Sequence, residues 1–239
     1  IDRTYDLILS DLDDAIAGLP EEYPAGRANA NAARALKSEV CLTAAAYTTD
    51  ATRKKTLCEQ AVVAVDAIQG YSLDANYGGM FNQENSYSST EIILARYFSK
   101  ENTNGGDTYM QTVIPNQGND NLKKLGRGPL FKKDWVFECW LEHSPSQNLV
   151  DDYEMKDGTP FDWNNPTHVA NMYYDASNKE TRDPRLYKNV LTNGSIWQKQ
   201  KVEIFEGGKN KILDGSTKTG YYLRKYMNPS VSLDPDKPN

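Results

Sequence analysis

The feature that most constrains the fold is a helical pattern of apolar residues that runs through the first 70 positions. Side chains three and four residues apart lie on one face of an α-helix. The first apolar stripe consists of Tyr5, Ile8, Leu12, Ile16 and Leu19. Pro20 prevents continuation of this helix because proline lacks a backbone N–H and its ring clashes with the preceding turn. The chain is therefore expected to begin with an amphipathic helix that ends near Gly18.

Two more helices are predicted, from about residue 31 to 47 and from about residue 52 to 69, with Gly70 as the stop. Their stripes are Ala33, Leu36, Val40, Ala44 and Tyr47, and Leu57, Ala61, Ala64, Val65 and Ile68. The short connections favour antiparallel neighbours, and the alanines allow close approach. Such hairpins are similar to tetratricopeptide-type pairs, although the repeat of about 34 residues is missing.

The pattern changes after residue 70 to a mixture of tyrosine, asparagine and glycine. Strands or extended segments are predicted at 91–98, 132–141, 186–191, 195–198 and 221–226, and short helices at 149–155 and 168–174. The polar stretch 99–129 is expected to be a functional or mobile loop. The fold class is therefore mainly α with a minor α+β part. We expect two domains, a helical part at 1–70 and an irregular, loop-rich part at 71–239.

Composition and charge exclude several classes of function. The chain has 27 basic and 33 acidic residues, and this net charge of -6 argues against a nucleic-acid partner. No apolar run reaches the length of a membrane span. With His143 and His168 as its two histidines, a histidine-rich metal site is excluded. Cys41, Cys58 and Cys139 are expected to be mostly buried free thiols, with a bridge between the first two left open.

The acidic and glycine-rich motifs favour structural roles. Residues 149–154 hold three carboxylates but lack a second carboxylate at the separation that a glycosidase needs, so they are interpreted as a capped turn. Residues 102–107 fail the calcium-loop template, and 207–208 lack the context of a nucleotide site. Residues 182–185, Arg-Asp-Pro-Arg, are expected to form an internal ion-pair network that fixes a loop. No enzymatic activity and no cofactor are expected.

A series of motifs, taken in order, resembles the SusD/RagB family of nutrient-binding outer-membrane lipoproteins. The pieces are the acidic helix at 7–16, Gly26-Arg27-Ala28 leading into 33–40, Tyr71-Ser72-Leu73 with Tyr77 and Phe81, Glu91-Ile92-Ile93, 145–155 with Asp157-Gly158, 182–185, and 219–226. The resemblance covers the middle of such a protein. It implies a lipidated N-terminal segment before this chain and further repeat helices after it.

The resemblance also implies a function. It predicts non-catalytic capture of an oligosaccharide or polysaccharide by a lipoprotein on the outer face of the outer membrane. The expected partner is a SusC-like TonB-dependent transporter, and the membrane is contacted through a lipid anchor outside this sequence. Two alternatives stay open: a RagB-type protein that takes up peptides, and a helical-repeat adaptor that binds other proteins.

Aromatic residues are the candidates for ligand contact. A large, stiff and amphipathic ring can cover the apolar face of a sugar. The candidate platforms are Trp140, Trp135, Tyr109 and Trp163. Trp140 leads because a strand at 132–141 would turn it toward solvent, beside two glutamates. Trp197 is assigned to the structure instead of the site.

Overall fold

The computed structural model describes residues 1–81, 87–97, 143–197, 200–205, 208, 210 and 217–227. The chain divides into two compact units, and each is described by itself. The first comprises Ile1–Ala75 and Asn85–Thr103, and the second comprises Asn76–Glu84 and Asn104–Asn239. The domain division at residue 70 stays a prediction.

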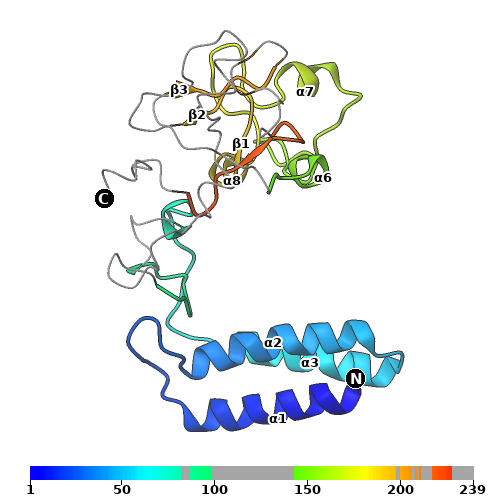
Figure 1. Cartoon of the computed structure of the whole chain (residues 1–239). Helices are drawn as coiled ribbons and strands as arrows, with labels where there is room; N and C mark the ends of the chain where they lie inside the picture. The colour runs from blue at the N-terminus through cyan, green and yellow to red at the C-terminus, as the bar shows by residue number, and fades with distance from the viewer. Residues whose placement is uncertain are drawn as a thin grey trace. The chain divides into compact units, whose positions relative to one another are not determined.

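Three helices build the first unit, and they lie side by side in alternating directions (Figure 1). They are α1 (Asp2–Gly18), α2 (Ala30–Tyr47) and α3 (Ala51–Asp66), and α2 packs against both of the others. The first two boundaries agree with the sequence pattern within one or two residues. The third helix ends earlier than predicted, at Asp66, and Gly70 follows it with a φ of +86°.

Polar side chains fix where α2 and α3 begin. The Asn29 carbonyl oxygen accepts a hydrogen bond from the Ala32 N–H at 2.8 Å. The Asp50 carboxylate accepts from the Thr52 N–H at 2.8 Å and from a second backbone N–H one residue later. Backbone N–H groups in a first helical turn have no partner within the helix, so each cap stabilises its helix by roughly 1 kcal/mol.

The core of the helical unit is formed by small residues, as the alanine content predicts. Its buried cluster consists of Leu9, Cys41, Ala44, Ala45, Leu57 and Ala61. Part of the predicted stripes is wrong, because Leu36, Tyr47 and Val65 are exposed. In α2 the predicted Ala33 and Ala44 are buried, Val40 is partly buried, and Cys41 and Ala45 are buried in addition. Cys41 is a buried free thiol, whereas Cys58 is free and exposed, contrary to the expectation of burial.

The second unit consists of short elements separated by long loops (Figure 1). Its described elements are η1 (Gly79–Phe81), α6 (Gln147–Asp151), α7 (Pro166–Ala170), α8 (Pro184–Asn189), β1 (Val190–Leu191), β2 (Ile196–Trp197), β3 (Gln200–Lys201) and β4 (Tyr222–Leu223). β1 pairs with β4 and β2 with β3, both antiparallel. The fold class is confirmed, because the described chain is mainly helical with a minor β part.

Several local predictions for this part of the chain were wrong. The described residues of the predicted strand at 91–98 form no strand. The predicted extended segment 186–191 is helical up to Asn189, because Asp183 caps α8 and Pro184 occupies its first turn, where proline is favourable. The predicted strand 132–141 and the long loop 99–129 lie outside the described residues.

Tyrosines dominate the core of the second unit. Val150, Leu186, Tyr187, Val190 and Tyr221 form its buried cluster, and Tyr153, Tyr173 and Tyr174 pack against it. Trp197 is 1% exposed, which confirms its structural assignment. In the part of the chain that the structure describes, no helix is long and apolar enough to cross a membrane. No cluster of metal-ligating side chains occurs among these residues.

Candidate functional site

Trp163 is the one predicted platform that lies within the described residues. It stands on the loop between α6 and α7, and 49% of it is exposed. Trp140, Trp135 and Tyr109 lie outside the described residues, so the structure does not test them. The site is therefore built around Trp163.

Asparagine and aspartate side chains shape the loop that carries Trp163. The Asp162 carboxylate accepts from the Asn164 N–H at 2.8 Å, which closes a tight turn around the tryptophan. The Asn165 side chain accepts from the Thr167 N–H at 2.9 Å and starts α7. His168, in α7, accepts from the Asp162 N–H at its Nδ1, at 3.1 Å. These bonds hold the tryptophan between a turn and a helix start.

Phe161 packs against both Trp163 and His168, and we call these three residues the aromatic platform. Phe161 meets Trp163 edge to face, with ring centroids 5.1 Å apart and planes at 83°. Phe161 also packs against His168 at 5.9 Å. Aromatic pairs at these separations add about 0.5–1.5 kcal/mol beyond area burial. The half-exposed indole is thus held by Phe161, which in turn packs against His168.

A polar edge borders the platform, formed by two side chains of α6. The Trp163 Nε1–H donates to the Asp151 carboxylate at 3.0 Å. The other carboxylate oxygen accepts from the Gln147 amide at 2.7 Å. Both oxygens of Asp151 therefore have protein donors, and the indole is fixed at its polar end. Sequence reasoning missed Phe161, Gln147 and His168 as members of this site.

A chain of hydroxyls connects the polar edge to the core. The Tyr221 hydroxyl donates to the Gln147 side-chain oxygen at 2.8 Å. The Tyr173 hydroxyl lies 2.7 Å from that of Tyr221 and donates to it, since the Tyr221 proton is used by Gln147. Burial raises the pKa of Tyr173 well above its usual range, and the bond to Tyr221 adds to this shift. Tyr173 therefore remains protonated and acts as a permanent donor.

Arg182 lies beneath the platform and is 1% exposed. Its guanidinium donates to the carbonyls of Val150 at 2.9 Å and Met172 at 3.3 Å, and to those of Tyr153 and Glu154. The guanidinium carbon is 4.2 Å from the centre of the Phe161 ring. Burial lowers the pKa of Arg182 from its usual value.

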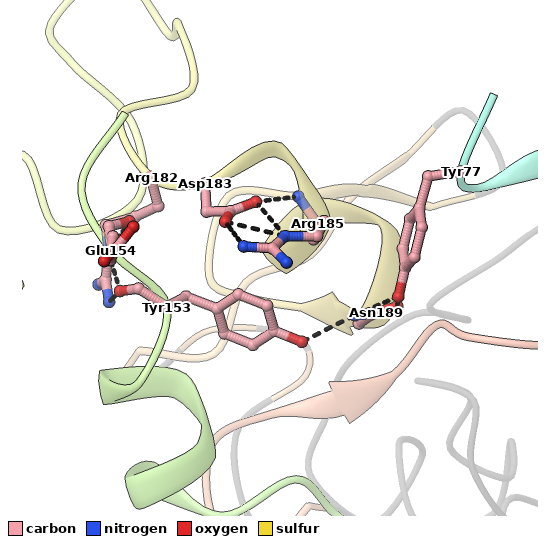
Figure 2. A network of polar contacts seen from close by, with 7 residues as sticks. All are labelled: Tyr77, Tyr153, Glu154, Arg182, Asp183, Arg185 and Asn189. Carbon is pink, nitrogen blue, oxygen red and sulfur yellow. Dashed lines mark hydrogen bonds and ion pairs between the residues drawn. The ribbon is translucent and has the colours of Figure 1, made fainter. Parts of the chain in front are cut away.

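These contacts correct the predicted ion-pair network at 182–185. Arg182 fixes the loop, as expected, but its side-chain hydrogen bonds among the described residues are with main-chain carbonyls instead of a carboxylate. Within the motif, an ion pair joins Asp183 to Arg185 (Figure 2). The Arg185 side chain is 62% exposed. Asp183 also caps α8 by accepting from the Arg185 N–H at 2.8 Å.

Two further tyrosines, Tyr77 and Tyr153, hold the C-terminal end of α8. The Asn189 side-chain amide donates to the Tyr153 hydroxyl at 2.7 Å and to the Tyr77 hydroxyl at 3.1 Å (Figure 2). Tyr77 belongs to the motif series that suggested the family, and its described role is to hold the end of α8. These contacts are structural, and they leave the platform as the exposed candidate site.

The fold and the site together define a mainly helical protein with an exposed, loop-borne aromatic platform. Residues 90–239 match the model of the SusD family, and the chain belongs to that family. One solved structure, described as a crystal structure with xylogluco-oligosaccharide, is 21% identical, with a TM-score of 0.48. The alignment covers 92% of this chain and 36% of that one, so this chain spans little over a third of its length. No curated protein matches.

Proposed function

We propose that this chain is part of a non-catalytic protein that binds an oligosaccharide and delivers it to a SusC-like TonB-dependent transporter. The observation that carries the proposal is the position of Trp163, which is half exposed and held by Phe161 and Asp151 in a member of the SusD family. Family membership supports the remaining parts of the proposal: a lipoprotein at the cell surface and tetratricopeptide-like helical hairpins in the first unit.

The physical basis for sugar binding is burial of the indole face. A pyranose ring presents C–H groups on one face and hydroxyls around its rim. The first can cover Trp163, while the hydroxyls reach exposed polar side chains such as Asn164, directly or through water. Because the indole is already fixed at its Nε1 and by Phe161, little side-chain freedom is lost on binding.

The carboxylate at the platform supports binding in preference to catalysis. Hydrolysis of a glycosidic bond uses two carboxyl groups, one of them a proton donor to the leaving oxygen. Asp151 accepts a hydrogen bond at each oxygen, from Trp163 and from Gln147. Both oxygens are thus engaged by protein donors, so the role that the contacts of Asp151 support is to orient the tryptophan.

Affinity gel electrophoresis with immobilised soluble glycans tests the proposal. The full chain and a Trp163→Ala variant are run through gels that contain xyloglucan, starch, a β-glucan or a pectin. A Phe205→Ala variant is the matched control, because Phe205 is a 54% exposed aromatic side chain of the same unit. We expect at least one glycan to retard the chain, and Trp163→Ala to weaken binding about tenfold, while Phe205→Ala does not.

Two results would count against the proposal, the first against glycan binding and the second against Trp163 as its site. Absence of retardation by every glycan, together with heat release from peptide mixtures in calorimetry, would favour the peptide-binding alternative. Retardation that is equal in the Trp163→Ala variant would move the site to Trp140, Trp135 or Tyr109. Co-purification of a large outer-membrane barrel with the full-length protein tests the transporter partner separately.

A further inference from the structure

We infer that Arg182 is the positioning residue of the aromatic platform, because it joins α6, α7 and Phe161 from beneath. The inference deepens the proposed function: the consequence for ligand affinity depends on sugar binding at Trp163, whereas the geometry does not. The guanidinium group makes each of the three connections directly.

The first connection is to α6, which supplies the polar edge. The Arg182 guanidinium donates to the carbonyl of Val150, the residue before Asp151, and to the carbonyl of Tyr153 two residues after it. Carbonyls at the C-terminal end of a helix have no partner within the helix and carry partial negative charge. A buried cation there fixes this helix end, and with it the carboxylate that accepts from Trp163.

The second connection is to the segment that follows α7. The Arg182 Nη1 donates to the Met172 carbonyl at 3.3 Å, two residues after that helix ends at Ala170. The neighbouring Thr181 hydroxyl donates to the Asn171 carbonyl at 2.6 Å. Together these bonds connect the end of α7 to Thr181 and Arg182. The position of His168, which lies in α7, therefore depends on these two residues.

The third connection is to the rings themselves. The guanidinium carbon lies 4.2 Å from the Phe161 ring centre, within the range of a desolvated cation–π contact. Phe161 in turn contacts both Trp163 and His168. A displacement of the guanidinium therefore reaches the exposed indole through a single intervening ring.

Arginine suits this position for a physical reason. Its planar fork offers five N–H donors in its own plane, which leaves its flat face free to stack on an aromatic ring. The in-plane donors meet the carbonyls of both helix ends, and the face meets Phe161. A lysine ammonium keeps the charge but cannot satisfy all of these partners at once.

Fluorine NMR of protein labelled with 5-fluorotryptophan tests the inference without any ligand. The chain contains four tryptophans, and a Trp163→Phe variant identifies the resonance of Trp163. Arg182→Lys removes the fork but keeps the charge. Phe161→Leu keeps the carbonyl partners of Arg182 and removes the intervening ring, so it remains informative if Arg182→Lys does not fold. Arg185→Lys is the matched control, because Arg185 is exposed and pairs outward with Asp183.

We expect Arg182→Lys and Phe161→Leu to shift and broaden the Trp163 resonance, while the buried Trp197 resonance stays in place. The control should leave both signals unchanged. An unchanged Trp163 resonance in either of the first two variants would overturn the positioning role. Titration with a xylogluco-oligosaccharide is a separate arm, in which both variants should bind about fivefold more weakly than the control. If the unmodified chain binds no glycan, the proposed function fails and the resonance shifts still decide the inference.

Discussion

The hydroxyl of Tyr187 gives the sharpest test of how the second unit is held together. Tyr187 is 2% exposed, and its hydroxyl accepts from the Arg182 N–H at 3.1 Å and from the Thr181 N–H at 3.0 Å. It also donates to the Tyr173 carbonyl. In a Tyr187→Phe variant Thr181 keeps a second acceptor, the Tyr173 carbonyl at 3.2 Å. The Arg182 N–H, in contrast, loses the hydroxyl while remaining buried.

The expected cost follows from this difference. A buried N–H that loses its acceptor costs about 1–3 kcal/mol, and the ring of the variant still fills the core. We therefore expect the free energy of unfolding to fall by about 2 kcal/mol. At roughly 2–4 °C per kcal/mol for a unit of this size, the melting temperature should fall by roughly 4–8 °C.

Differential scanning calorimetry is the appropriate assay, since it resolves separate transitions if the two compact units melt independently. The control is Tyr226→Phe, which removes a hydroxyl from a residue that is 60% exposed, and it should change stability by less than about 0.5 kcal/mol. Equal melting temperatures for the two variants would refute the reasoning, because they would show that the Arg182 N–H finds another acceptor at no cost.

Three further outcomes follow from burial and charge in the structure. Leu186→Ala, at a side chain that is 0% exposed, should lower stability by about 2–5 kcal/mol in urea titrations, while Leu149→Ala, at 45% exposure, should cost under about 1 kcal/mol. Iodoacetamide at pH near 8 should alkylate the exposed Cys58 at least about tenfold faster than the buried Cys41, whose pKa is raised by burial. Peptide mass spectrometry measures both rates, and equal rates would contradict the burial of Cys41 in the helical core. The hydrogen bond from Arg185 lowers the pKa of Asp183 below its usual 3.8. The contribution of Asp183 to folding stability is therefore present above that pH and is lost as the pH falls through the folded pKa. Asp183→Asn should flatten the fall of the urea midpoint between about pH 5 and 3, and an unchanged dependence of the midpoint on pH would refute this linkage.

The helical unit could be predicted from the sequence because its signals are local. The spacing of Tyr5, Ile8 and Leu12 and the position of Pro20 define α1 without reference to the rest of the chain. The error lay in which residues are buried. An alanine-rich helix has an indistinct apolar face, so packing against two neighbours buried Cys41 and Ala45 beside the predicted Ala44 and left Leu36 and Tyr47 exposed.

The second unit was less predictable, because its order comes from contacts between distant residues. The cap at Asp183 makes residues 184–189 helical. The sequence contains this signal as Asp-Pro, but the prediction gave more weight to the following residues, which are typical of strands. For the site, Trp163 was predicted as a candidate platform, and the structure leaves it 49% exposed. Its partners Phe161 and Asp151 lie nearby in the sequence and could have been predicted with it. Arg182, in contrast, lies 19 residues after Trp163 and meets these residues only in the folded structure.

The bonds of Arg182 have a consequence for protein engineering. They end on the main-chain oxygens of Val150, Tyr153, Glu154 and Met172, and a carbonyl is supplied by any of the twenty amino acids. The support is therefore indifferent to the side chains at these positions, provided that the backbone path is kept. A combinatorial library that varies exposed residues such as Glu154 and Asn164, with Arg182 and Phe161 held constant, therefore changes the surface of the proposed site without rebuilding the scaffold.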